Sequence, residues 1–139
     1  MKIVLDASAV AKWFIVEEES AEMKTILSQI VSGRLEAHAP SILQVELANL
    51  LRYAKGLTHS EVKTAVQALA ALGITFHDDY TLLPSAIETA FEKNLTVYDS
   101  LYVALAESLG ATLITYDKEI LGKYSKARKA TSYLEKKKM

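Results

Sequence analysis

The 139-residue sequence contains no cysteine, only two prolines and five glycines, and no apolar run long enough to cross a membrane. Without cysteine, the chain forms neither disulfides nor thiolate metal sites. Its three histidines, His38, His59 and His77, are not closely spaced, which argues against a zinc site of the usual kind. No repeat, low-complexity segment or linker interrupts the sequence. We therefore expect one domain over residues 1–139 of a soluble cytoplasmic protein.

Charge is nearly balanced overall but unevenly distributed along the chain. The whole sequence carries 16 Lys and Arg against 17 Asp and Glu. Residues 1–117 hold 8 basic and 15 acidic side chains, a net charge of −7, whereas residues 118–139 hold 8 and 2, a net charge of +6. A basic segment after an acidic body suggests phosphate contacts beside an acidic pocket. For Lys136–Lys138 the alternative is a solvated terminus.

Apolar periodicity alternates between strand-like and helix-like segments. It predicts strands at residues 2–5, 35–39, 74–77, 112–115 and 130–133, and helices at residues 7–14, 20–32, 41–55, 58–72, 82–93, 99–109 and 118–123. Strands that alternate with helices indicate an α/β fold in which a parallel sheet is covered by helices on both faces.

Four carboxylates fall where such a sheet would gather them. Asp6 and Asp117 directly follow two strand-like runs, while Glu46 and Asp99 lie near the starts of predicted helices. Because the carboxyl ends of parallel strands share one edge, we expect all four side chains at that edge. Like charges held together repel unless a cation neutralises them, and oxygen ligands suit Mg²⁺ or Mn²⁺. The sequence therefore predicts a hard-metal site.

Each carboxylate also has a purely structural interpretation. Asp6, Asp99 and Asp117 stand at helix starts, where aspartate commonly caps the helix or complements its dipole. Glu46 lies deeper in its helix, beyond capping range, so solvation or an ion pair is the alternative there. The evidence for a site is the convergence of the four residues on one edge.

A metal bound by these carboxylates would support hydrolysis of a phosphodiester, because it lowers the pKa of bound water and offsets charge on the phosphate oxygens. Ser8 and Thr115 are candidates to orient water or phosphate, with backbone hydrogen bonding at turns as the alternative. Asn49 shares a helix face with Glu46 and is a third supporting candidate. The pair Asp78–Asp79 is a possible fifth acidic contribution, although a turn also explains it.

Four segments carry a resemblance to a known family. They are Ile3–Ser8, Glu46–Arg52, Tyr98–Ala106 and Leu113–Asp117. In order, spacing and total length the sequence resembles the PIN-domain nucleases, and among them the VapC-like toxins of prokaryotic toxin–antitoxin pairs. The resemblance implies a three-layer α/β/α sandwich with a mainly parallel central sheet.

The same resemblance implies an Mg²⁺- or Mn²⁺-dependent endoribonuclease. Asp6, Glu46, Asp99 and Asp117 would be its acidic quartet, binding the metal and serving catalysis. The implied partners are an RNA substrate, a cognate antitoxin protein that occupies a groove near the site, and a second copy in a homodimer.

Basic residues of the C-terminal segment are our candidates for contact with the RNA backbone. They are Lys123, Lys126, Arg128 and Lys129. Three aromatic side chains, Trp13, Phe14 and Tyr102, occur at the helical spacing typical of a core, with a partner surface or base-stacking platform as the alternative.

Two other functions remain open. A phosphoacceptor receiver domain would need a second acid after the first strand and a lysine after the last core strand, but Ala7 and Asp117 stand there. A catalytically silent PIN-like module that binds metal or RNA as a scaffold would keep the fold. The intact quartet argues against such a module.

Overall fold

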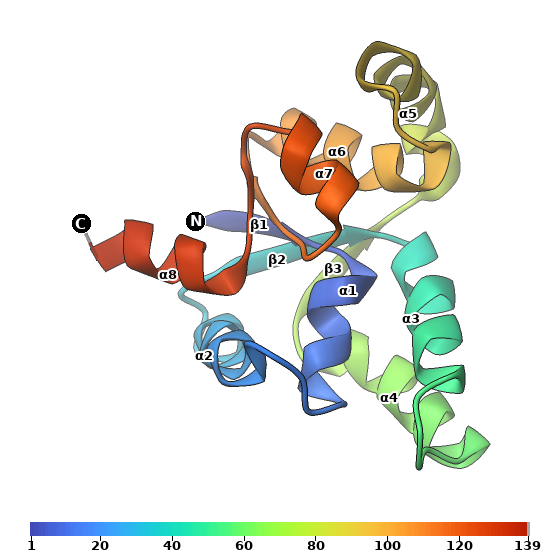
Figure 1. Ribbon diagram of the computed structural model, residues 1–139, viewed down its shortest axis with the longest axis vertical. Coiled ribbons are helices and arrows are strands. Elements are labelled where there is room, and N and C mark those ends of the chain that lie inside the picture. The colour runs from blue at the N-terminus through green and yellow to red at the C-terminus, as the bar shows by residue number, and fades with distance from the viewer. Residues whose placement is uncertain (139) are drawn as a thin grey trace.

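The computed structural model describes residues 1–138, with side chains to residue 136, and centres on a five-stranded sheet (Figure 1). The strands are β1 (Lys2–Leu5), β2 (Glu36–Pro40), β3 (Ile74–His77), β4 (Thr112–Ile114) and β5 (Ala127–Arg128). They lie in the order β3-β2-β1-β4-β5, and every neighbouring pair is parallel. The predicted α/β fold is confirmed, and the sheet is parallel throughout.

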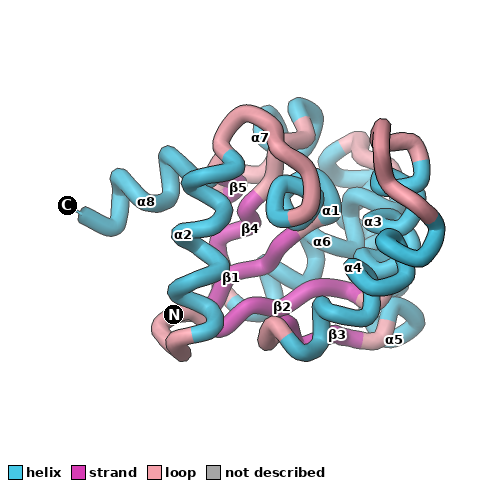
Figure 2. Tube along the Cα trace, turned by 90° about the horizontal axis from the view of Figure 1, so that it is seen from below, coloured by secondary structure: helices cyan, strands magenta, loops and turns pink. Residues whose placement is uncertain are grey.

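Helices cover both faces of the sheet and complete three layers (Figures 1 and 2). On one face lie α5 (Asp79–Lys93), α6 (Val97–Leu109) and α7 (Lys118–Lys123). On the other lie α1 (Ala7–Val10) with the 3₁₀ turn η1 (Ala11–Trp13), α2 (Ser20–Val31), α3 (Ile42–Arg52) and α4 (His59–Ala71). The last helix, α8 (Ala130–Lys138), packs against α2 and β5.

The core forms around β1, the middle strand of the sheet. Ile3, Val4 and Leu5 are inaccessible to solvent, because helices cover a central parallel strand on both sides. On one face α6 contacts β1, β2 and β4, and its residues from Ser100 to Ala106 are all buried. Each large apolar side chain buried in this way stabilises the fold by about 1.5–3 kcal/mol. The residues that directly follow β1 and β4 are therefore held on a rigid frame.

Side-chain caps place two helix starts earlier than predicted. α5 begins at residue 79 rather than 82, because the carboxylate of Asp78 accepts a hydrogen bond from the Thr81 N–H at 3.1 Å. α6 begins at residue 97 rather than 99, because the Thr96 hydroxyl accepts from the Asp99 N–H at 3.1 Å. Asp99 thus lies inside the first turn of α6 and does not cap it.

The strand predicted at residues 130–133 is wrong. The chain pairs with β4 earlier, through β5, and is helical from Ala130 onward. The helix sets Ala130, Tyr133 and Leu134 on one face at the spacing i, i+3, i+4. Ala130 and Tyr133 are buried and Leu134 packs against the core, whereas a strand would have turned Ala130 and Tyr133 to opposite faces. No helix within residues 1–138 is both long and apolar enough to cross a membrane.

Candidate functional site

A cleft of about 300 Å³ opens at the edge where β1 and β4 end. Asp6 follows β1, Asp117 follows β4, Glu46 comes from α3 and Asp99 from α6. The lining residues are Asp6, Ala7, Ser8, Glu46, Asn49, Leu50, Asp99, Tyr102 and Asp117. All four carboxylates of the predicted quartet, together with Ser8 and Asn49, therefore share one cleft.

Asp6 is the most constrained of the four carboxylates. Its Oδ1 accepts hydrogen bonds from the Ser8 hydroxyl at 2.7 Å and the Ala9 N–H at 3.1 Å, and its Oδ2 accepts one from the Thr115 hydroxyl. Burial raises the Asp6 pKa to about 6, and the charge of Asp117 adds to the rise, while these hydrogen bonds oppose it. Asp6 also caps α1, so this residue both caps a helix and lines the cleft.

Ser8 and Thr115 join the ends of β1 and β4 as well as supporting Asp6. The Ser8 hydroxyl accepts from the Tyr116 N–H at 2.9 Å, and the Thr115 hydroxyl accepts from the Asp117 N–H at 3.0 Å. Thr115 is completely buried behind the cleft. The turn-bonding alternative is correct for both hydroxyls, and through it they fix the position of Asp6 relative to Asp117.

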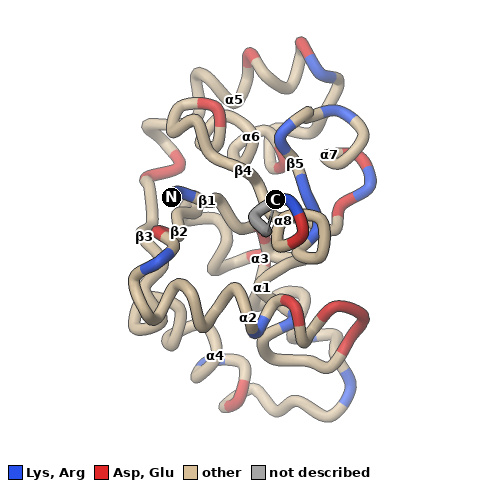
Figure 3. The backbone as a smooth tube through the Cα atoms, turned by 90° about the vertical axis from the view of Figure 1, so that its left-hand side faces the viewer, with Lys and Arg blue, Asp and Glu red and all other residues tan. Residues whose placement is uncertain are grey.

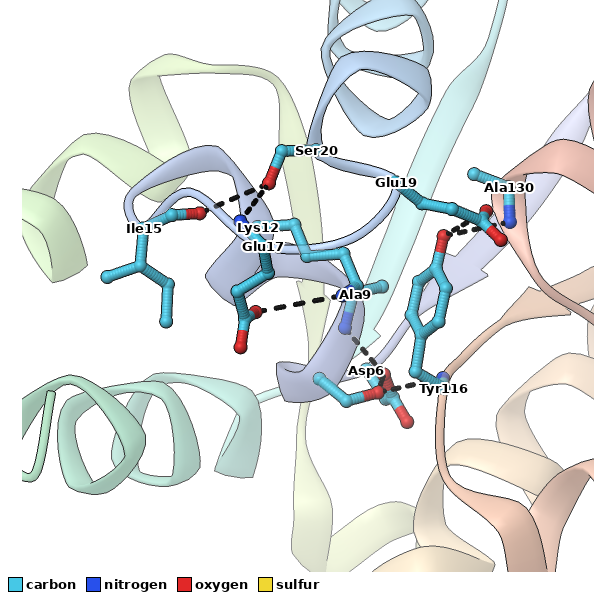
Figure 4. Close-up of polar contacts among 10 residues, drawn as sticks. Asp6, Ala9, Lys12, Ile15, Glu17, Glu19, Ser20, Tyr116 and Ala130 are labelled. Carbon is cyan, nitrogen blue, oxygen red and sulfur yellow. Dashed lines mark hydrogen bonds and ion pairs between the residues drawn. The ribbon is translucent and has the colours of Figure 1, made fainter.

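The segment leaving β4 is anchored on its other side by Tyr116 (Figure 4). The Tyr116 hydroxyl donates to Glu19 Oε1 at 2.8 Å and accepts from the Ala130 N–H at 3.1 Å. The buried Lys12 places its Nζ 4.3 Å from the centre of the Tyr116 ring and 3.7 Å from Glu17 Oε1. These contacts hold the backbone from which Asp117 projects.

Glu46 is positioned by Tyr102, whose hydroxyl donates to Glu46 Oε1 at 2.5 Å. Burial raises the Glu46 pKa, as do the charges of Asp99, Asp79 and Asp117, while the bond from Tyr102 lowers it. Burial and the adjacent Glu46 raise the pKa of Tyr102, so its hydroxyl stays protonated and remains a donor. The helical spacing predicted a core position for Tyr102, which is confirmed, but not this contact with Glu46. Its position three residues after Asp99, on the same helix face, was the available signal.

Asp99 and Asp117 are the other two carboxylates of the cleft. Burial raises the Asp99 pKa, and the charges of Asp117 and Glu119 raise it further, while Thr96 lowers it. Asp117 caps α7, because its Oδ1 accepts from the Ile120 N–H at 3.0 Å. Three members of the quartet therefore have raised pKa values, which is the effect expected of carboxylates crowded in a partly buried site.

Comparison with known proteins identifies the family. The family model of the PIN domain matches residues 3–126, which is most of the chain. The chain belongs to the PIN-domain family. Ribonuclease VapC3 of Pyrobaculum aerophilum is 33% identical over 129 residues, covering 89% of this chain and 95% of that protein. The predicted resemblance to VapC-like PIN proteins is confirmed.

Solved structures show the same fold. A crystal structure from Pyrobaculum aerophilum matches with a TM-score of 0.74 at 21% identity, over 98% of this chain and 88% of that one. A toxin–antitoxin complex from Klebsiella pneumoniae matches with a TM-score of 0.69 at 15% identity, over 92% and 97% respectively. The three-layer PIN-like sandwich expected from the sequence is thus confirmed.

The donor set of this PIN-domain cleft fits a hard divalent cation. Its charged ligands are all carboxylate oxygens, which suit Mg²⁺ or Mn²⁺. Within residues 1–138 no three acidic or histidine side chains are already gathered closely enough to form a ligand set. A cation bound in the cleft would offset the mutual repulsion of the four carboxylates.

The remaining acidic candidates act around the cleft rather than in it. Asp78 caps α5, and Asp79 Oδ1 accepts from the Ile42 N–H at 3.1 Å, at the first residue of α3. Asp79 does not line the cleft, yet its charge contributes to the raised pKa of Glu46. In place of the predicted turn, Asp78 caps a helix, and Asp79 holds the helix that carries Glu46.

The four basic candidates separate into two pairs. Lys123 forms an ion pair with Glu119 at 2.7 Å and donates to the Asn94 carbonyl at 2.7 Å, and Lys129 interacts electrostatically with Glu19. Lys126 and Arg128 line a groove with Thr112, the first residue of β4. Lys126 precedes β5, so it lies at the opposite edge of the sheet from the acidic pocket. Arg128 pairs with Ile114 at the other end of β5, but its side chain turns back toward the Ser125 carbonyl and this groove.

Proposed function

We propose that this PIN-domain protein is a divalent-metal-dependent endoribonuclease and the toxin component of a toxin–antitoxin pair, with residues 1–139 as a single domain. The convergence of Asp6, Glu46, Asp99 and Asp117 on one cleft carries the proposal. The relative from Pyrobaculum aerophilum is named a ribonuclease, which supports RNA as the substrate.

The quartet would hold Mg²⁺ or Mn²⁺, the cations preferred by oxygen ligands. A cation bound there supplies Lewis-acid stabilisation of phosphodiester charge and lowers the pKa of water. The protein's own part is to hold its ligands in place: Ser8 and Thr115 fix both oxygens of Asp6, and Tyr102 fixes one oxygen of Glu46. Such supporting hydrogen bonds commonly change metal affinity or activity by about 10- to 100-fold.

Asn49 and Leu50 form the outer wall of the cleft. Both are exposed and lie on α3, next to the turn that carries Glu46. The Asn49 amide can donate to a phosphate oxygen without adding negative charge, and Leu50 offers an apolar surface to a sugar or base. The cleft is otherwise acidic, so a phosphodiester enters it favourably only together with the cation.

The proposed antitoxin partner has a suitable apolar groove close to the cleft. A groove of about 390 Å³ is lined by Phe14, Leu51, Leu57, Ala65 and Ala68, together with polar residues of α4. It shares α3 with the cleft, because Leu51 follows the cleft residue Leu50. An amphipathic antitoxin segment would lay its apolar face along this groove. The structural match to a toxin–antitoxin complex supports a partner of this kind.

The proposed homodimer has its own surface on α5. Tyr80, Ile87 and Phe91 are 82%, 42% and 86% exposed and recur at helical spacing along the outer face of that helix. Exposed large apolar side chains in a row mark an interaction surface more often than isolated ones do. We propose that the same helix of a second copy covers this row.

Cleavage of a mixed RNA pool tests the function. The antitoxin-free chain is incubated with Mg²⁺, with Mn²⁺ or with EDTA, and compared with Asp99→Asn and a matched control, Asp78→Asn, which changes an exposed helix cap outside the cleft. We expect metal-dependent cuts in the wild type and the control, and none in Asp99→Asn. Equal cutting by Asp99→Asn would remove the cleft as the active site. Metal binding without any cleavage would favour a toxin of narrow specificity whose target is absent from the pool, and neither metal binding nor cleavage would favour the scaffold function.

A further inference from the structure

A second groove, of about 270 Å³, lies at the edge of the sheet opposite the acidic cleft. Its lining includes Gly110, Thr112, Lys126, Arg128, Tyr133 and Lys136. Gly110 caps the end of α6, Thr112 begins β4, Lys126 precedes β5 and Arg128 ends it, and the last two belong to α8. We call it the amino-edge groove. Figure 3 views the molecule from this side, with Lys and Arg in blue around β5 and α8.

The amino-edge groove carries positive charge without a compensating acid. Of its described lining residues three are cationic and none is acidic. Lys126 and Lys136 are exposed, and neither forms an ion pair with a carboxylate of the described chain. A concave surface lined by charges of one sign concentrates the field and attracts counter-ions.

Arg128 is held in place in this groove. Its Nη1 donates to the Ser125 carbonyl at 2.6 Å and to the Ala127 carbonyl at 2.8 Å. Three further N–H donors, on Nε and Nη2, have no acceptor among the described residues. A guanidinium that is already oriented loses little freedom when it binds a phosphate, and its planar donors match phosphate geometry.

Three other basic side chains interact with carboxylates. Lys12 is paired with Glu17, Lys123 with Glu119, and Lys129 faces Glu19. The acidic cleft has no basic side chain among its lining residues. A polyanion that reaches the cleft therefore needs its electrostatic attraction from another part of the surface.

We propose that the amino-edge groove binds the phosphodiester backbone of the RNA substrate, away from the bond that is cut. This inference rests on the proposed ribonuclease function and extends it to a second contact on the substrate. The groove offers ammonium and guanidinium donors and no exposed aromatic face, so it reads backbone charge rather than base identity. The RNA strand would pass along the β5 edge of the sheet, between groove and cleft.

The sheet separates the two contacts. Thr112 in the groove begins β4, and Asp117 in the cleft lies beyond its last residue, Ile114. A single bound strand would therefore touch both ends of β4.

The test measures RNA binding without cleavage. A fluorescein-labelled single-stranded RNA of 20 nucleotides is titrated in EDTA, at several salt concentrations, with the wild type and with the double variant Lys126→Gln/Lys136→Gln. The matched control is Lys24→Gln/Lys63→Gln, which removes two exposed lysines from α2 and α4. Both variants lose two positive charges, so a difference in their RNA binding depends on where the lysines lie and not on net charge.

We expect the groove variant to bind at least roughly tenfold more weakly at 0.1 M salt. Its plot of log K against log salt should be less steep by about 1.4, at 0.7 for each lost phosphate contact. The control should keep the wild-type slope. The proposal is overturned if the groove variant keeps the wild-type salt slope, or if the wild type binds no RNA. Selective binding of a DNA duplex of the same length also overturns it.

The two proposals fail separately, because binding in EDTA does not depend on catalysis. Metal-dependent cleavage by the wild type, with an unchanged salt slope in the groove variant, would disprove RNA binding by the groove and support the ribonuclease function. A lowered salt slope in the groove variant, with no RNA cleavage by the wild type, would support RNA binding by the groove and disprove the catalytic function.

Discussion

Replacing Asp6 with asparagine should stabilise the metal-free protein at neutral pH. Asp6 is only 5% exposed, and burial, assisted by the charge of Asp117, raises its pKa from 3.8 to about 6. The hydrogen bonds from Thr115, Ser8 and Ala9 oppose this rise without cancelling it. The ionised carboxylate is therefore less favourable in the folded chain than in the unfolded one.

The size of the effect follows from the pKa difference. A rise from 3.8 to about 6 corresponds to about 3 kcal/mol. Because the folded state has the higher pKa, the stability contributed by the protonated carboxyl is complete below pH 3.8 and is lost as pH rises through about 6. Asparagine stays neutral but replaces one acceptor oxygen with an NH₂ group, which disturbs a hydrogen bond worth about 1 kcal/mol. The expected net gain at pH 7.5 is about 1–2 kcal/mol.

Urea unfolding between pH 5 and pH 7.5, in EDTA and followed by the fluorescence of Trp13, provides the assay. The wild type should lose about 1.4 kcal/mol relative to Asp6→Asn over that range, because most of the folded-state ionisation of Asp6 occurs within it. Asp78→Asn serves as the control and should follow the wild-type pH dependence, since Asp78 is an exposed helix cap.

Two results would refute the reasoning. One is an Asp6→Asn protein less stable than the wild type at pH 7.5 in EDTA. The other is a difference between the two proteins that does not change with pH. Addition of Mg²⁺ should then reverse the order, because a cation that binds only the folded wild type stabilises it through mass action.

Four further predictions concern single contacts. Tyr102→Phe removes the hydroxyl that positions Glu46 and should lower cleavage about 10- to 100-fold; less than a threefold loss would contradict that role. Glu46→Gln should abolish metal-dependent cleavage without loss of stability, and cleavage at full rate would disprove the site assignment. Phe91→Glu should convert a dimer into monomers in sedimentation velocity, and an unchanged sedimentation coefficient would exclude α5 as the interface. Thr58→Ala should cost about 1 kcal/mol in urea unfolding, because it removes the capping box shared with Glu61; no loss would show that the cap contributes little.

Periodicity and topology were sufficient to predict where the quartet lies. Asp6 and Asp117 follow strands that are buried on both faces. The apolar runs of these strands could therefore be recognised from the sequence, without knowing which strands they pair with. Parallel strands end at the same edge, and that rule brings Asp6, Glu46, Asp99 and Asp117 to one cleft. The capping box at Thr58 was equally readable, because it depends on neighbours three residues apart.

Elements held by long-range contacts were harder to predict. The chain from Ala130 is helical because Tyr133 and Leu134 pack against the core, and three apolar residues are too few to establish that period from the sequence. β5 has only two residues and is defined by its pairing with Leu113 and Ile114. Both were missed for the same reason, since packing rather than propensity determines them.

Within the site, the sequence by itself determined which side chains carry charge and at which edge of the sheet they gather. Tertiary structure decided what holds them: the Tyr102 hydroxyl on Glu46, and the Thr115 hydroxyl on Asp6, 109 positions away in the chain. It also separated the basic residues: Lys126 precedes β5 at the far edge, and the Arg128 side chain turns back toward the Ser125 carbonyl and the same groove. Charge and period are local properties of a chain, whereas hydrogen-bond partners and the direction a side chain faces exist only once distant segments have packed together.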